Sequence, residues 1–119
     1  NCLQKFKNID VLINNAGVFF PGEVHQEEDG VLEQMIETNV YSAYRMSRSI
    51  IPNMKARKAG YIFNIASIAG LQAYPNGGSY SISKFAMIGM GKALRQELLN
   101  DNIKVSNNNI LLKLSSAII

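Results

Sequence analysis

A tyrosine and a lysine stand four residues apart in the segment 77–84, which reads GGSYSISK. If this segment is helical, Tyr80 and Lys84 lie on one face of the helix, with phenol and ammonium side by side. The phenol of free tyrosine has a pKa of about 10, and a neighbouring cation favours its ionised form. The pair could therefore act as a general acid and base on the oxygen of a carbonyl or an alcohol.

The same lysine also completes a second motif. Ser81 and Lys84 form the pattern Ser-x-x-Lys, in which penicillin-recognising acyl enzymes use the serine as their nucleophile. Those enzymes also need a Lys-Thr-Gly strand, and this tripeptide is absent from the sequence. The local spacing leaves either hydroxyl open as the partner of Lys84, but the missing tripeptide counts against Ser81.

Two more polar residues could join this pair. Ser67 follows a strand-like apolar run, and the glycine-containing loop after it could fold back and bring its hydroxyl near Tyr80. There it could hydrogen-bond a substrate carbonyl, or simply cap a turn. Asn39 lies between Ile36 and Ala43 on the apolar stripe of a predicted helix. Because an unpaired buried amide costs about 1–3 kcal/mol, Asn39 is either a satisfied core residue or a holder of water.

The tetrapeptide NNAG, residues 14–17, closes the first apolar run. Asn15 could tie one strand to the next, and Gly17 would let a backbone or a ligand approach closely. The tetrapeptide alone is equally compatible with a simple turn.

The elements that would position these residues alternate along the chain. We expect strands over Asp10–Asn14, Tyr61–Ala66 and Ile103–Ser106, and helices over Glu28–Arg57 and Ser79–Leu99. Pro52 should kink or restart the first helix. The first two strands are continuous apolar runs, which is typical of parallel strands covered on both faces. The order predicts an α/β doubly wound parallel sheet, with ligands beyond the carboxyl ends of its strands.

The composition fits a single soluble globular domain. Of the 119 residues, 47% are hydrophobic and 18% charged, and the net charge of +3 is scattered, so we expect no nucleic-acid partner. Cys2 is the only cysteine, which excludes an internal disulfide and leaves zinc without partners. The N-terminus does not resemble a signal peptide, and no run reaches the roughly 18–20 apolar residues of a membrane span. We therefore expect a cytoplasmic chain without a membrane partner.

Together, the motifs resemble the short-chain dehydrogenase/reductase family of NAD(P)-dependent oxidoreductases, which have a Rossmann fold. The resemblance covers about Asp10 to Val105 and rests on NNAG at 14–17, TNV at 38–40, NIASIAG at 64–70 and YSISK at 80–84. It implies a partial Rossmann-type βαβαβ sheet without the N-terminal glycine-rich βαβ unit. It also implies hydride transfer between NAD or NADP and a carbonyl or secondary alcohol, with a small molecule as the substrate.

The resemblance also implies roles for single residues. Tyr80 would donate or accept the proton, Lys84 would favour its phenolate and bind the nicotinamide ribose, and Ser67 would orient the substrate carbonyl. Asn39 would anchor a water of the proton relay. The cofactor cleft would be lined by Asn15, Ala16 and Gly17, together with Tyr80 and Lys84. Both long helices would pair copies of the chain in a homodimer or homotetramer.

The sequence departs from the family pattern at both ends. The glycine-rich phosphate loop would precede NNAG and is not contained in this chain, and the proline-glycine pair expected after the last strand is replaced by NNNILLKLSSAII. We therefore divide the chain into a partial NAD(P)-binding domain, residues 1–106, and a divergent or truncated tail, residues 107–119. The alternative to an oxidoreductase is a catalytically incompetent fragment or a helix-mediated interaction module.

Overall fold

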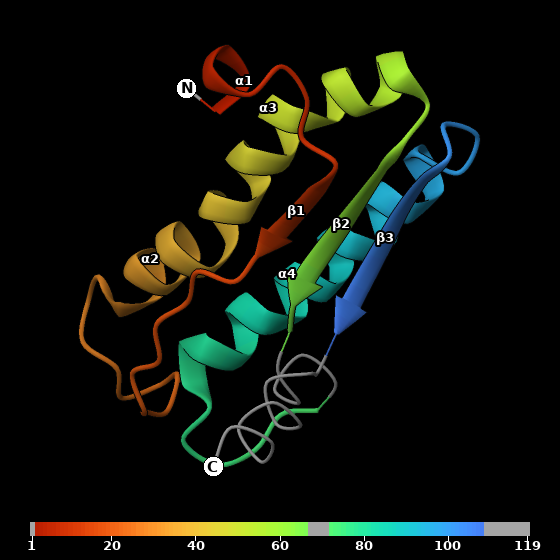
Figure 1. Cartoon of the computed structure of the whole chain (residues 1–119). Coiled ribbons are helices and arrows are strands. Elements are labelled where there is room, and N and C mark those ends of the chain that lie inside the picture. The colour runs from red at the N-terminus through yellow and green to blue at the C-terminus, as the bar shows by residue number, and fades with distance from the viewer. Residues whose placement is uncertain (1, 67–71, 109–119) are drawn as a thin grey trace, which may run out of the picture.

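The computed structural model describes residues 2–66 and 72–108 (Figure 1). Its elements are, in order, α1 (Cys2–Lys5), β1 (Val11–Asn14), α2 (Val31–Ile36), a π-helical turn (Glu37–Tyr41), α3 (Ser42–Arg57), β2 (Gly60–Ile65), α4 (Gly78–Glu97) and β3 (Ile103–Asn108). Strands alternate with helical segments, so the predicted α/β fold class is confirmed. No helix of the described residues is long and apolar enough to cross a lipid bilayer.

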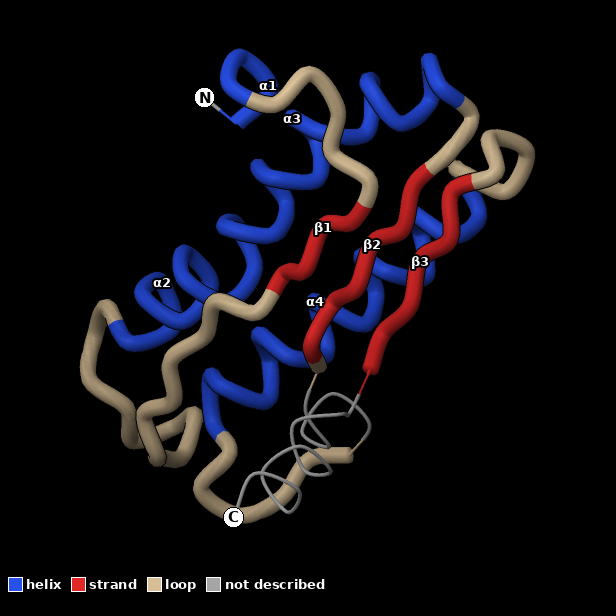
Figure 2. Tube along the Cα trace, viewed as in Figure 1, coloured by secondary structure: helices blue, strands red, loops and turns tan. Residues whose placement is uncertain are grey.

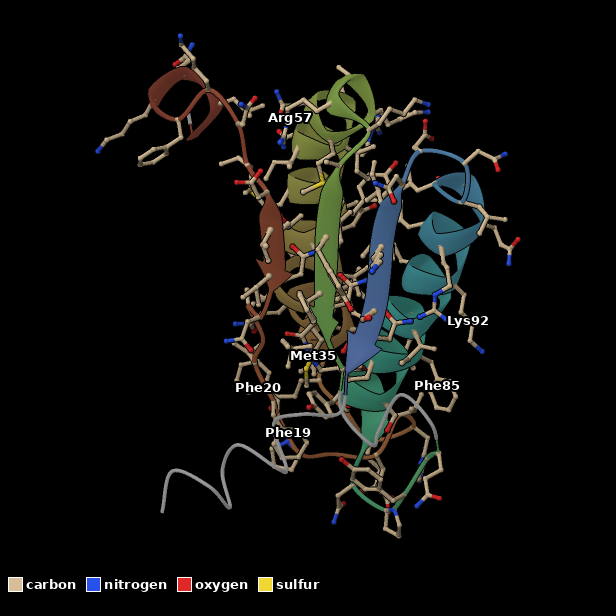
Figure 3. The ribbon with its side chains drawn as sticks, turned by 45° about the vertical axis from the view of Figure 1, so that its right-hand side comes forward. Phe19, Phe20, Met35, Arg57, Phe85 and Lys92 are labelled. Atoms are coloured by element: carbon tan, nitrogen blue, oxygen red, sulfur yellow. The ribbon has the colours of Figure 1, made fainter. Side chains whose placement is uncertain are left out.

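The three strands form one parallel sheet in the order β1-β2-β3 (Figure 2). Asn14 pairs with Asn64, and Asn64 pairs with Asn107, so the carboxyl ends of the strands meet at one edge. Both crossovers step in the same direction along the sheet. Since such crossovers are right-handed, α3 and α4 lie together on one face, behind the sheet in Figure 3.

The core lies between this face of the sheet and the two long helices. Its buried side chains are Leu12, Ile62, Ile103 and Val105 from the strands, with Ile50, Met54 and Leu98 from the helical segments and the turn after α4. Burial in β1 alternates strictly, so Leu12 and Asn14 are buried whereas Val11 and Ile13 are exposed. The described residues therefore cover one face of the sheet, although the apolar runs predicted cover on both.

The first predicted helix is one helical region with an irregular centre. It begins at Val31, widens into the π-helical turn at Glu37–Tyr41 and continues as α3 to Arg57. The sequence suggested a kink or a restart at Pro52; the residue lies inside α3, and the helix does not restart there. A separate irregularity lies at the turn that contains Asn39. Turns of this kind hold one extra residue and are frequent at functional sites.

The third strand is longer than predicted. β3 runs to Asn108, two residues past the predicted end, because Asn107 and Asn108 pair with Asn64 and Ile65 of β2. The strand thus includes the first two residues of the segment that the sequence suggested was a divergent tail. Residues 109–119 lie outside the described residues.

Candidate active site

The first turns of α4 bring Tyr80 and Lys84 together, as their spacing predicted. The Lys84 Nζ atom lies over the Tyr80 ring, 5.5 Å from its centroid. Phe19, from the loop after β1, meets the same ring edge-on, with centroids 4.8 Å apart and planes at 73°. Figure 3 shows Phe19 beyond the carboxyl ends of the strands. This is the edge at which parallel α/β sheets bind their ligands.

Lys84 is a buried cation. Only 5% of its surface is exposed, and no carboxylate within the described parts of the chain forms an ion pair with it. A methyl group added at Gly17 would lie 3.5 Å from Lys84 Nζ, so the backbone of the NNAG segment passes close to the amine. Burial disfavours the charged form and lowers the pKa of Lys84 below its ordinary value. The amine retains donors for a ligand that brings hydroxyl groups or negative charge.

Asn39 is fully buried, and its side chain connects three segments. Its Oδ1 accepts a hydrogen bond from the Val18 backbone N–H at 2.7 Å, and its Nδ2 donates to the Val18 carbonyl at 2.9 Å. Nδ2 also donates to Ser83 Oγ at 3.0 Å. Both amide hydrogens are thereby used, and only Oδ1 keeps a lone pair free for water. Asn39 is thus a satisfied core residue that joins the π-helical turn to the NNAG loop and to α4.

Ser83 is a site residue that the sequence interpretation missed. It is fully buried, accepts the bond from Asn39 and donates its own hydroxyl to the Tyr80 carbonyl at 2.7 Å. A signal was present, because Ser79, Ser83 and Met87 follow one another at intervals of four on a single helix face. Ser83 connects Asn39 to the helical turn that carries Tyr80.

In the NNAG segment, the asparagine that hydrogen-bonds to the neighbouring strand is not the predicted one. Asn14, rather than Asn15, ties the strands, because its Nδ2 donates to Asn64 Oδ1 at 2.9 Å and to Ser47 Oγ of α3 at 3.3 Å. Asn64 in turn donates to Asn107 Oδ1 at 3.2 Å, which completes a row of amides across all three strands. Asn15, Ala16 and Gly17 are exposed beyond the end of β1, where a ligand could reach them.

Ser81 is not paired with Lys84. Its Oγ atom is buried without a hydrogen-bond partner among the described residues, so no base activates it as an acyl enzyme requires. Ser81 instead lines a cavity of about 560 Å³ with Tyr74, Pro75, Ile82 and Phe85, and neither Tyr80 nor Lys84 borders that cavity. The structure therefore places the Lys84 amine over the Tyr80 ring and gives the Ser81 hydroxyl no hydrogen-bond partner among the described residues.

Ser67 lies outside the described residues, so its approach to Tyr80 stays a prediction. The residue before it, Ala66, is 1% exposed and directly follows the end of β2. Asn39, Tyr80 and Lys84 are brought together by the described structure, with Gly17 beside the last.

Comparisons with known proteins agree on one family. The sequence model of the family described as short chain dehydrogenase matches residues 1–110. Retinol dehydrogenase 8 of Bos taurus is 37% identical over 106 residues, which are 89% of this chain and 34% of that protein. A 3-ketodihydrosphingosine reductase of Bacteroides thetaiotaomicron is 37% identical over 97 residues, 82% of this chain and 36% of its own length. The chain therefore spans about a third of each of these relatives.

Solved structures give the same result. A short-chain dehydrogenase from Streptomyces avermitilis superposes with a TM-score of 0.84 at 30% identity, over 87% of this chain and 38% of the other. A metagenomic short-chain oxidoreductase in complex with NADP superposes with a TM-score of 0.82 at 34% identity, over 88% of this chain and 48% of the other.

Proposed function

The chain belongs to the short chain dehydrogenase family, and from this premise we propose that it carries the catalytic residues of an NAD(P)-dependent oxidoreductase. The reaction is the interconversion of a carbonyl and a secondary alcohol, and the substrate is a small molecule. One observation carries the proposal. The buried ammonium of Lys84 faces the Tyr80 ring without a carboxylate partner among the described residues.

In this proposal Tyr80 donates or accepts the proton, and the Lys84 ammonium stabilises the negative charge of the Tyr80 phenolate. During reduction the Tyr80 hydroxyl gives its proton to the carbonyl oxygen, which leaves a phenolate beside the Lys84 ammonium. Their attraction is strong because few water molecules screen it at a buried amine. Ser67, which follows β2, would donate a hydrogen bond to the same carbonyl oxygen. Asn39 would hold a water with the free lone pair of its Oδ1 atom.

The residues around Lys84 fit a nicotinamide nucleotide. Lys84 offers N–H donors to ribose hydroxyls, and Asn15, Ala16 and Gly17 leave an exposed backbone beside it. When bound, the nucleotide supplies or takes up the hydride. The NADP complex of the related metagenomic oxidoreductase supports this cofactor class.

The test is Tyr80→Phe in the full-length protein. It removes one oxygen atom, and we expect oxidation of NADH or NADPH by carbonyl substrates to fall by at least about 100-fold, in line with the loss of a general acid. Nucleotide binding should persist, which fluorescence titration would verify. Tyr41→Phe is the matched control, because Tyr41 lies on the exposed side of the π-helical turn and contacts Arg45. Undiminished turnover in Tyr80→Phe would refute the proposed function.

A second candidate applies to the 119 residues on their own, namely an incompetent fragment or an interaction module. It is favoured by the short span of the chain relative to its relatives and by the uncovered face of the sheet. Titration of NADH and NADPH into the purified 119-residue chain separates the two. Saturable binding at micromolar concentration supports the oxidoreductase proposal, whereas no binding supports the fragment.

We further propose that two copies of the chain pair through the outer faces of α3 and α4. Large apolar side chains are exposed on both helices, with 42% of Tyr44, 41% of Met46 and 46% of Phe85 accessible. Figure 3 shows Phe85 directed away from the sheet. Sedimentation should report a dimer or tetramer that Phe85→Glu dissociates, and a monomeric parent would contradict the pairing.

A further inference from the structure

A carboxylate from outside α4 binds the beginning of this helix. Glu27, in the loop between β1 and α2, accepts the Ser79 backbone N–H with Oε1 at 2.8 Å and the Ser79 hydroxyl with Oε2. The two residues are 52 positions apart in the sequence. Ser79 is fully buried, and it directly precedes Tyr80. The Glu27 carboxylate thus binds both the backbone and the side chain of Ser79, which is the residue next to the proposed proton donor Tyr80.

The helix has no cap of its own. Gly77 occupies the N-cap position and makes no side-chain hydrogen bond there, so Glu27 supplies what Ser, Thr or Asp supplies in most helices. A negative charge at this end also complements the helix dipole. The first turn of a helix frays most easily when its N–H groups lack acceptors.

Residue types on both sides are matched to this contact. A methyl group at Gly78 would lie 2.2 Å from Glu27 Oε1 and 2.5 Å from the Gly22 carbonyl, and Gly78 has a φ of 49°, which favours glycine. The Gly22 N–H also donates to the Asn76 carbonyl at 3.2 Å. The loop that holds Glu27 is therefore fitted against the residues that lead into α4.

We propose that Glu27 is a positioning residue for Tyr80. Tyr80 belongs to the first turn of α4, whereas Lys84 and Ser83 belong to the next. If the first turn frayed, the phenol would move relative to the Lys84 amine while the rest of the helix stayed in place. Glu27 prevents this by holding Ser79. The inference rests on the proposed function, because it assigns Glu27 to the geometry of the same reaction.

The experiment compares Glu27→Ala, Glu27→Gln and Ser79→Ala with Glu28→Gln in the full-length protein. Glutamine keeps both bonds, because its oxygen can accept the Ser79 N–H and its amide can donate to the hydroxyl. Glu28 is exposed, and its side chain forms no hydrogen bond or ion pair with the described residues, so it is the matched control. For Glu27→Ala we expect kcat to fall about tenfold or more, with both KM values within about twofold. Glu27→Gln should restore most of kcat, and Ser79→Ala should be intermediate.

A second measurement does not depend on turnover. Hydrogen exchange of the amides of residues 79–84 should be about 3- to 30-fold faster in Glu27→Ala, which is the range expected for a lost cap, and unchanged in Glu28→Gln. A kcat for Glu27→Ala within twofold of the parent, or unchanged exchange at 79–84, would overturn the proposal. Failure of the proposed function looks different, since Tyr80→Phe would then leave turnover intact while the exchange result still decides whether Glu27 holds the helix.

Discussion

The charge that serves the proposed chemistry should cost stability. Burial lowers the pKa of Lys84 in the folded protein. In the unfolded chain the amine has its ordinary pKa of about 10.5 and stays protonated up to that pH. Between the lowered folded pKa and 10.5 the unfolded state binds more protons, so the free energy of unfolding rises with pH across this window. Lys84→Met should remove this rise, should unfold at higher denaturant concentration at pH 7 and should lack activity.

Urea unfolding at pH 7 and pH 10, without nucleotide, checks this prediction. Lys92→Met is the control, because Lys92 is exposed on the same helix and its removal should change stability by less than about 0.5 kcal/mol. The free energy of unfolding of Lys84→Met is compared with that of the parent at each pH, because the other titrating groups contribute equally in both proteins. A difference that does not change with pH would contradict the buried-ammonium account.

Single residues also show what the sequence could predict. The contact between Tyr80 and Lys84 and the burial of Asn39 could be predicted, because each depends on residue spacing within a single helical segment. The strand-tying amide was assigned one residue too late, at Asn15, because side chains alternate in a strand and a continuous apolar run does not reveal which set is inward. Glu27 escaped notice because its partner is distant in sequence, and no local pattern marks such a contact.

At the scale of elements, α4 and β3 meet at a glycine. A methyl group at Gly91 would lie 1.9 Å from Asn107 Oδ1, and Asn107 is held by Asn64 and by the Ile88 carbonyl. Gly91→Ala should therefore lower the free energy of unfolding by about 1–3 kcal/mol. In the double variant with Asn107→Ala, the loss of unfolding free energy should be smaller than the sum of the two single losses by about 0.5–3 kcal/mol.

Chemical denaturation of the parent, both single variants and the double variant gives this coupling. Gly89→Ala is the control, because no atom lies within 4 Å of the added methyl group and helix propensity should then stabilise the protein by up to about 1 kcal/mol. Strict additivity of Gly91→Ala and Asn107→Ala would show that the contact between α4 and β3 does not require glycine.

Helices and strands could be predicted where the apolar periodicity is strong. Local irregularities were missed where tertiary contacts determine the backbone conformation. The stripe of apolar residues predicted the helical region, but it continues through Glu37–Tyr41 without marking the π-helical turn. Pro52 suggested a kink or a restart, and the helix does not restart there. The turn coincides with the bonds from Asn39 to Val18 and Ser83, and such partners are not visible in the sequence of the helix.

At the scale of the whole molecule, one face of the sheet is not covered by the described residues. Parallel sheets are almost always covered on both faces, but here Val11 is 50% and Ile13 60% exposed, and the rings of Tyr61 and Phe63 stack beside them at 4.0 Å. The relatives are about three times as long as the matched segment. We therefore expect further polypeptide, outside these 119 residues, to cover this face in the full-length protein.

Ile13→Lys tests this expectation by giving opposite results in two settings. In the purified 119-residue chain it should improve solubility and reduce binding of a hydrophobic dye, because it removes exposed apolar surface. In the full-length protein it should lower the free energy of unfolding by about 2–4 kcal/mol, because it buries a charge where a side chain packs. Val24→Lys is the control, since Val24 is 63% exposed in a loop away from the sheet and should be tolerated in both settings. If Ile13→Lys were tolerated equally well in the full-length protein, this face of the sheet would be open to solvent there as well, which would contradict the expectation.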